Sequence, residues 1–221
     1  MEPTTPVDLS RVWAVVPIRG LRTAKTRLSP DLDPAERLAL VTEMLRRTLV
    51  ATRDAESIEG TVVVTLDPRV AGIATEHRAV GLVDILPGLN EAILAARSLA
   101  VSRDASAVLI LPADLPSVTA ERLDALVAEA LAALAGAGPD TAAHGLVAVV
   151  PDRHREGTNA LLVAPATLID PDFGAGSRGA HRAAATAAGA TYLEIDGPLT
   201  LDVDTPADLL LASAALGPAD A

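Results

Sequence analysis

Strand and helix patterns alternate along most of this chain, and that alternation restricts the fold more than any other feature of the sequence. Short apolar runs such as 13–18 and 107–111 are typical of buried strands. Between such runs lie longer stretches whose apolar residues recur every three or four positions, as Leu38, Val41 and Leu45 do. Strands that alternate with helices favour a mostly parallel sheet with helices on both faces. We therefore expect an α/β fold.

The same pattern continues to the end of the chain. The expected strands span 13–18, 61–66, 82–86, 107–111, 146–150, 159–163, 191–195 and 199–203. The expected helices span 34–52, 69–77, 90–103, 120–135, 177–188 and 206–215. A flexible surface loop is expected at 136–145, which is rich in glycine and small residues. Because the sequence contains no repeat and no separate segment, we expect one domain over 11–215, with tails at 1–10 and 216–221.

The composition excludes several classes of protein. Half of the residues are apolar, which is too many for a disordered chain, and the absence of cysteine excludes disulfides and thiolate metal sites. The acidic N-terminus lacks the features of a secretory signal, and the apolar stretch 123–137 contains Asp124 and Glu129 and is too short to cross a bilayer. The net charge of −11 argues against a nucleic-acid partner. We expect a cytoplasmic protein that binds neither membrane nor nucleic acid.

One segment near the N-terminus has the opposite charge to the rest of the chain. Residues 11–30 contain no acidic residue. The basic residues of this segment are Arg11, Arg19, Arg22, Lys25 and Arg27. A basic segment in an acidic protein indicates a small, highly anionic ligand. Lys25 is the only lysine in the chain, and its compact ammonium reaches into a cluster of phosphates better than a planar guanidinium does.

The loop after the first expected strand, 17–30, has the sequence P-I-R-G-L-R-T-A-K-T-R-L-S-P. Parallel sheets place their ligand crevices beyond the carboxyl ends of such strands. The loop resembles a P-loop in having Gly20, four further residues and then Lys25-Thr26, but the second glycine of that motif is missing. The loop therefore indicates a triphosphate site, with a solvated basic turn as the alternative.

Acidic residues follow two later strands. Asp114 lies in L-P-A-D-L-P-S, just beyond a strand that we expect to be central. A carboxylate there can hold Mg²⁺ together with phosphate oxygens, and the alternative is that Asp114 shapes a turn between two prolines. Asp202 and Asp204 lie in L-D-V-D-T-P-A-D, at the expected end of a strand. A helix N-cap accounts for Thr205 and Pro206 of that motif but not for the two acids before them.

A glycine-rich segment precedes the helix expected at 177–188. It has the sequence F-G-A-G-S-R-G-A-H-R, in which Gly174 and Ser177 leave backbone N–H groups free to bind an anion, with Arg178 and Arg182 beside them. The alternative is a flexible connector with Ser177 as a simple cap. The four histidines lack metal-ligand spacing, and we expect His181 to orient the Ser177 loop.

Together these segments resemble the nucleotidyltransferases with a GT-A-like, nucleotide-diphospho-sugar transferase-like fold. More narrowly, the sequence is similar to the phospholactate/phosphoenolpyruvate guanylyltransferases, which act in the synthesis of the deazaflavin coenzyme F-420. The similarity extends over about 11–215, beginning with V-V-P-I-R-G-L-R-T-A-K-T-R-L-S-P. It continues in order through L-P-G-L-N-E-A, L-P-A-D-L-P, G-T-N-A-L-L, F-G-x-G-S-x-x-x-H and D-V-D-T-P-x-D-L. A molybdopterin guanylyltransferase or a sugar-phosphate enzyme should have a more glycine-rich opening loop ending in an Arg-Met-Gly-like segment, which this chain lacks.

The resemblance implies a role for particular residues. Lys25 and Asp114 are implied to be catalytic. The residues implied to bind the nucleotide are Gly20, Lys25 and Arg27 at the phosphates and Gly88 and Asn90 near the guanosine. Those implied to contact the small phosphorylated acid are Thr158, Gly174 and Ser177. Asp114 and either Asp202 or Asp204 are implied to bind Mg²⁺, with Asp204 favoured.

The implied reaction moves GMP from GTP onto the phosphate of phosphoenolpyruvate, which gives enolpyruvyl-diphosphoguanosine and pyrophosphate. A phosphate monoester is already ionised near neutral pH, since its second pKa is about 6, so the attack needs no general base. The same reaction on 2-phospholactate or 3-phosphoglycerate remains open, as does a catalytically silent nucleotide-binding regulator. The protein is expected to act as a monomer or homodimer.

Overall fold

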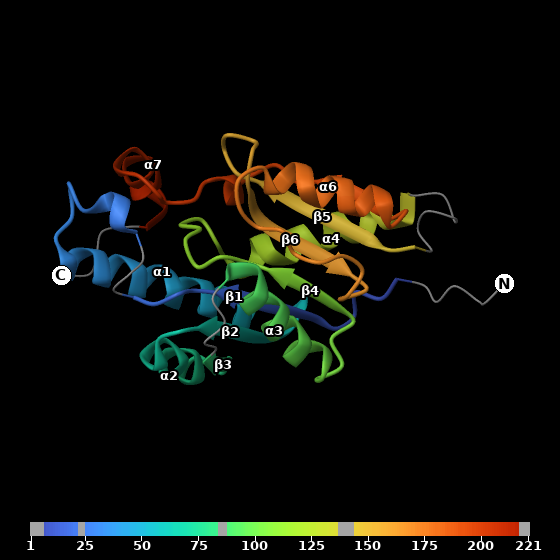
Figure 1. Cartoon of the computed structure of the whole chain (residues 1–221), viewed down its shortest axis with the longest axis horizontal. Coiled ribbons are helices and arrows are strands. Elements are labelled where there is room, and N and C mark those ends of the chain that lie inside the picture. The colour runs from blue at the N-terminus through green and yellow to red at the C-terminus, as the bar shows by residue number, and fades with distance from the viewer. Residues whose placement is uncertain (1–6, 22–24, 84–87, 137–143, 217–221) are drawn as a thin grey trace.

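The computed structural model describes residues 7–21, 25–83, 88–136 and 144–216, and these fold around one seven-stranded sheet (Figure 1). The strands are β1 (Val12–Pro17), β2 (Ile58–Thr65), β3 (Val80–Val83), β4 (Ala107–Ile110), β5 (Leu146–Pro151), β6 (Thr158–Ala164) and β7 (Thr191–Glu194). The helices are α1 (Pro34–Asp54), α2 (Pro68–Glu76), α3 (Leu89–Val101), α4 (Ala120–Gly136), α6 (Ser177–Ala187) and α7 (Pro206–Leu216). Two short 3-10 helices are η1 (Thr26–Leu28) and η2 (Pro198–Thr200).

The sheet is mostly parallel, as the alternation predicts. The strand order is β3-β2-β1-β4-β6-β5-β7, and all neighbouring pairs are parallel except the two that involve β6. Because β6 runs against β4, its first residues lie at the same edge of the sheet as the last residues of β1 and β4. That edge therefore collects residues from three distant parts of the sequence.

Apolar side chains cover both faces of the sheet, and Figure 1 shows helices on each side. On one face Leu109 and Leu162 pack with Leu126 of α4 in a core of buried residues. On the other face Ile110 packs in a core with Ile93 of α3. This alternation of neighbouring strand residues between two cores is the pattern of a strand buried on both sides. It confirms the expected α/β fold with helices on both faces.

The first residues of α1 have side chains that favour the start of a helix. Asp33 is the N-cap and accepts hydrogen bonds from the backbone N–H groups of Ala35 and Glu36, while the Glu36 side chain accepts one from the Asp33 N–H. This reciprocal arrangement is a capping box, and Pro34 occupies the first helical position, where its missing N–H costs nothing.

The strand predicted at 199–203 is wrong. The segment forms η2 and then an irregular stretch in which Asn159 Nδ2 donates to the Leu199 carbonyl and the Val203 N–H donates to the Asp114 carbonyl. These backbone groups therefore bind loops and side chains instead of a neighbouring strand. Leu199 and Val203 are nevertheless buried, which explains their strand-like alternation in the sequence.

Strand β6 contains an irregularity that matters for the site. Val150 pairs with Ala160 and Pro151 pairs with Thr158, so β6 has one extra residue, Asn159, at this point. An extra residue of this kind is a β-bulge, which re-aims the side chains around it. Thr158 contacts α6 on one face of the sheet, whereas its neighbour Asn159 contacts the segment around η2 on the other, because successive strand residues point to opposite faces.

The remaining predictions concern the ends of elements. The strand predicted at 61–66 begins three residues earlier, at Ile58. Residues 84–86 of the strand predicted at 82–86 lie outside the described residues, as do 137–143 of the predicted loop and most of both predicted tails. No helix in the described part of the chain has the length and apolar character needed to cross a bilayer.

Candidate active site

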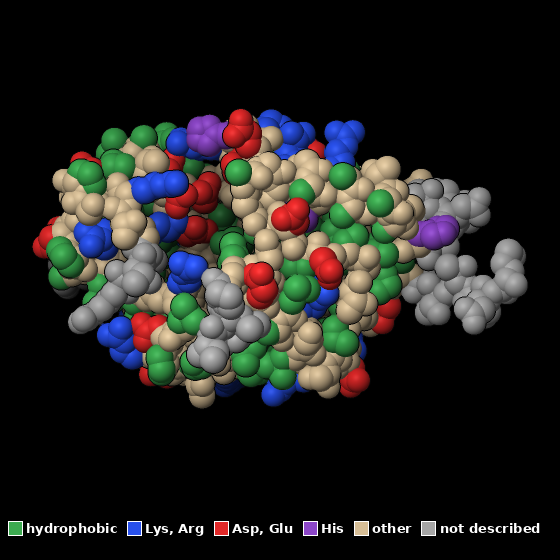
Figure 2. All heavy atoms as spheres, in the orientation of Figure 1, with side chains coloured by type: hydrophobic (Ala, Val, Ile, Leu, Met, Phe, Trp, Pro, Cys, Tyr) green, Lys and Arg blue, Asp and Glu red, His purple; other side chains and the backbone are tan. Residues whose placement is uncertain are grey.

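Three carboxylates converge at the carboxyl edge of the sheet. Asp114 follows β4, and Asp202 and Asp204 lie between η2 and α7. One carboxylate oxygen of each lies within 4.8 Å of the others, an arrangement able to hold a metal ion. We call these three residues the acidic cluster. In the space-filling view acidic side chains gather in a hollow left of centre (Figure 2).

Lys25 lies inside this cluster. Its Nζ atom is 2.6 Å from Asp114 Oδ2 and 2.6 Å from Asp204 Oδ1. The side chain is only 9% exposed, and the backbone takes the left-handed conformation, with φ at 57°. Burial lowers the pKa of Lys25, but the attraction of Asp114 and Asp204 outweighs this and holds the pKa above its ordinary value. The amine is therefore a charged ammonium, and the structure brings Lys25 into direct contact with Asp114.

Asp202 is the carboxylate that Lys25 does not contact. Burial raises the pKa of Asp202, and the negative charges of Asp114 and Asp204 raise it further. Its hydrogen-bond donor is Asn159 Nδ2, 3.5 Å from Asp202 Oδ1. A further cation in the acidic cluster would stabilise the ionised form of Asp202.

Asp204 is held in place by the first turn of α7. Asp208 Oδ2 accepts hydrogen bonds from the Asp204 N–H, the Thr205 N–H and the Thr205 hydroxyl. The other oxygen of Asp208 lies 2.5 Å from Arg153, in the loop between β5 and β6. Sequence reasoning missed Asp208 and Asn159 as site residues. The T-x-x-D spacing of a capping box was the available signal for Asp208.

The residues predicted to bind the nucleotide lie in separate segments of the chain. Gly20 lies in the loop after β1, whose backbone continues to pair with β2 through Ile18. Arg27 is 76% exposed, with Nη1 3.5 Å from Asp204 Oδ2. Gly88 is the N-cap of α3. Asn90 exchanges two hydrogen bonds with the backbone of Phe173, so its amide is already engaged.

The residues predicted to bind the phosphorylated acid meet at the start of α6. Ser177 is the first residue of this helix and is buried, and Gly174 has φ at +145°, a conformation that favours glycine. The Thr158 hydroxyl lies 3.0 Å from His181 Nδ1, one turn into the helix. The three predicted residues thus meet at one end of one helix, and their contacts with a substrate stay a prediction. The expected free N–H of Ser177 is wrong, because this group donates to the Gly174 carbonyl.

Not every predicted cation belongs to a ligand site. Arg178 donates to both carboxylate oxygens of Glu194 and to the Arg155 carbonyl, so its charge is neutralised within the protein. Arg11 lies before β1, at the opposite end of that strand from the Lys25 loop, and its guanidinium is 3.4 Å from Asp104. The basic segment of the sequence is therefore divided by β1 and does not form a single patch.

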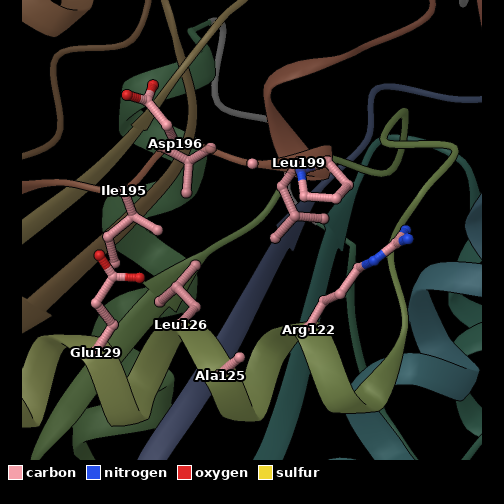
Figure 3. Close-up of a pocket in the computed structure, with 10 residues that line it drawn as sticks. Arg122, Ala125, Leu126, Glu129, Ile195, Asp196 and Leu199 are labelled. Atoms are coloured by element: carbon pink, nitrogen blue, oxygen red, sulfur yellow. The ribbon is translucent and has the colours of Figure 1, made fainter.

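A separate cavity of about 120 Å³ lies between α4 and the segment 195–199 (Figure 3). Leu126, Ile195 and Leu199 give it a largely apolar lining, with Arg122 and Glu129 beside them (Figure 3). None of the predicted site residues lines it. The acidic cluster and the start of α6 therefore form the candidate active site, and this cavity does not.

Comparison with known proteins gives consistent results. A family profile described as "Guanylyl transferase CofC like" matches residues 12–212. A protein of Sphaerobacter thermophilus named phosphoenolpyruvate guanylyltransferase is 41% identical over 198 residues, covering 89% of this chain and 89% of its own length. A protein of Rubrobacter xylanophilus with the same name is 39% identical over 207 residues, covering 93% of this chain and 95% of its own length.

Solved structures confirm the expected fold. A putative nucleotide-diphospho-sugar transferase from Desulfovibrio desulfuricans has a TM-score of 0.67 at 16% identity, covering 90% of this chain and 84% of its own. A nucleotidyl transferase from Methanothermobacter has a TM-score of 0.56 at 17% identity, covering 90% of this chain and 94% of its own. At these identities the likeness concerns the fold alone.

The raised pKa of Asp202 yields a prediction about stability. Because the folded protein raises this pKa, Asp202 stabilises the fold only while it is protonated, and that contribution is lost as the pH rises through the folded pKa. In a chelating buffer at pH 7, Asp202→Asn should therefore raise the melting temperature by roughly 2–4 °C, the shift that about 1 kcal/mol produces in a domain of this size.

Thermal unfolding at pH 7 and near pH 4 measures this effect. The gain in melting temperature should shrink as the pH falls toward 4. The pKa of Asp202 is raised above its ordinary value of 3.8, so the wild-type carboxyl becomes protonated in that range. Asp104→Asn is the matched control, since it makes the same charge change at a side chain that is 83% exposed. A lower melting temperature for Asp202→Asn at pH 7 would contradict the prediction.

Proposed function

This chain belongs to the family of CofC-like guanylyl transferases, and we propose that it transfers the guanylyl group of GTP to the phosphate of phosphoenolpyruvate. The products are enolpyruvyl-diphosphoguanosine and pyrophosphate, in the biosynthesis of coenzyme F-420. The observation that carries the proposal is the Lys25 ammonium, held 2.6 Å from both Asp114 and Asp204 at the carboxyl edge of the sheet. The relatives named for this reaction support the choice of substrates.

The reaction has one main difficulty, which is to bring two polyanions together. An oxygen of the acceptor phosphate attacks the α-phosphorus of GTP, and the bond from that phosphorus to the bridging oxygen of the β-phosphate breaks, so that pyrophosphate leaves. The acceptor oxygen is already ionised near neutral pH, because the second pKa of a phosphate monoester is about 6. The protein therefore has to supply positive charge and orientation, which are the main contributions to phosphoryl transfer in general.

Lys25 supplies part of this charge directly. With Asp202 ionised, the acidic cluster and the Lys25 ammonium carry an excess of two negative charges, which suits a divalent cation. Carboxylate oxygens are the ligands that Mg²⁺ prefers, so Asp114, Asp202 and Asp204 would hold it. When bound, Mg²⁺ would neutralise phosphate oxygens and order them for the reaction. Lys25 and Asp114 are thus the residues to which we assign the catalytic role.

The nucleotide is assigned in this proposal to the loop after β1 and to the start of α3. Gly20 and Arg27 join Lys25 at the triphosphate, as their places in the loop after β1 and beside Asp204 suggest. Gly88 and Asn90, at the start of α3, are assigned to the guanosine side.

The phosphorylated acid is assigned to the start of α6. Thr158, Gly174 and Ser177 lie there, and the positive end of the helix dipole favours an anion. We place the enzyme in the cytoplasm, as a monomer or a homodimer, with no membrane or nucleic-acid partner.

The proposed function predicts which substrates react fastest. Pyrophosphate release, measured over four nucleoside triphosphates and three acceptors with Mg²⁺, should be fastest for GTP with phosphoenolpyruvate. The other acceptors are 2-phospholactate and 3-phosphoglycerate, either of which replaces phosphoenolpyruvate in the proposal if it reacts fastest. A catalytically silent regulator would bind GTP without releasing pyrophosphate in any combination, and that result would overturn the proposed function.

The proposed role of Asp114 predicts a loss of turnover without a loss of stability when its carboxylate is removed. Asp114→Asn should lower kcat by about 10²–10³-fold, because the variant loses a carboxylate from the cation site at the reacting phosphates. Its melting temperature should change little, because Lys25 keeps Asp204 as a partner at 2.6 Å. Steady-state kinetics and thermal unfolding measure the two effects.

Asp104→Asn serves again as the control for the Asp114 variant. Asp104 is exposed and lies before β4, whereas Asp114 follows the other end of that strand. Its kcat should equal that of the wild type. Normal turnover of Asp114→Asn would remove Asp114 from the catalytic machinery.

A further inference from the structure

His181 is a fully buried histidine that joins three segments at the start of α6. Its Nδ1 atom lies 3.0 Å from the Thr158 hydroxyl of β6, and its Nε2 atom lies 3.0 Å from the backbone nitrogen of Asp172. Its ring also packs edge-on against Phe173, with 5.1 Å between ring centroids. Each polar atom of this ring is therefore engaged.

The two hydrogen bonds fix the protonation of the ring. A backbone N–H can only donate, so His181 Nε2 must accept the bond from Asp172 and carry no proton. A neutral imidazole then has its proton on Nδ1. Burial lowers the pKa of His181 to about 4, against a smaller opposing effect of the Asp172 charge, so the ring is neutral at physiological pH. His181 Nδ1 accordingly donates to Thr158 Oγ1.

This polarity determines what the Thr158 hydroxyl can do. Its oxygen accepts the proton from His181, so the hydroxyl's own proton is left for another acceptor. Among the described residues, no other side chain or backbone group hydrogen-bonds to Thr158 Oγ1. A hydroxyl arranged in this way is a donor that suits an anionic oxygen.

The same ring also fixes the segment that precedes the helix. Asp172 is held by His181, and the next residue, Phe173, exchanges two hydrogen bonds with the Asn90 amide of α3. Gly174 follows directly. The backbone directly before Gly174 is therefore anchored through His181 at one residue and Asn90 at the next.

We propose that His181 is a positioning residue for the phosphorylated acid, which it serves by making the Thr158 hydroxyl a hydrogen-bond donor toward an oxygen of that substrate. This inference rests on the proposed function, because it takes Thr158 to touch the acceptor. His181 itself touches no substrate. Its effect passes through Thr158, so removing either partner should have the same consequence.

A double-mutant cycle tests the coupling. The variants are Thr158→Val, His181→Gln and the double variant, because a glutamine amide oxygen can replace Nε2 as acceptor from Asp172 while the Nδ1 donor is lost. Each single variant should raise the KM for phosphoenolpyruvate about tenfold, with the KM for GTP nearly unchanged. The double variant should be no worse than Thr158→Val. His77→Gln, at the end of α2, is the control and should match the wild type.

Some results would overturn the proposal. Effects of the single variants that multiply in the double variant would do so, because His181 would then act independently of Thr158. An unchanged KM for phosphoenolpyruvate in His181→Gln would do so too, as would an equal rise in the KM for GTP.

A second measurement needs neither turnover nor a folded variant. Ring ¹⁵N resonances of the wild-type protein without substrate should show His181 protonated at Nδ1 and not at Nε2 near pH 7. A ring protonated at Nε2 would overturn the proposal even in an active enzyme. Absence of pyrophosphate release by the wild type would instead overturn the proposed function, and the tautomer would still be known.

Discussion

Three carboxylates within 4.8 Å of one another repel, and the functional edge of this sheet depends on the cation that is held between them. Lys25 provides that cation from the loop after β1 and contacts two of the three acids. The third, Asp202, keeps a raised pKa, so the cluster is only partly neutralised. The protein thus keeps an excess of negative charge at this edge of the sheet. A divalent cation can neutralise that charge, and the bound cation can in turn attract a triphosphate.

The reversal of β6 connects this charge to the second half of the site. Because β6 runs against β4, its first residues lie at the same edge as Asp114, and neighbouring side chains along it point to opposite faces. Asn159 contacts Asp202 on one face, while Thr158 contacts His181 on the other. Two neighbouring residues of one strand therefore link the proposed metal ligands to the proposed acid site, and a shift there would disturb both.

The sequence predicts those features that depend on local order along the chain, and it fails where long-range contacts decide. The alternation of apolar runs and amphipathic stretches was sufficient for the sheet, and positions just after expected strands were sufficient to find Lys25 and Asp114. The strand predicted at 199–203 has the right periodicity, but its hydrogen bonds go to Asp114 and Asn159. No local pattern could reveal the bulge in β6, because it depends on the pairing with β5.

The contrast between Lys25 and Arg27 shows why the one lysine of the chain lies where it does. An ammonium is a compact charge with three donors, so Nζ approaches two carboxylates from different segments at 2.6 Å while the side chain stays 9% exposed. The guanidinium of Arg27 is broader and stays at the rim, 76% exposed and 3.5 Å from Asp204. An arginine at position 25 would have to force Asp114 and Asp204 apart to fit its planar group, and the cluster would lose the spacing that suits a small divalent ion.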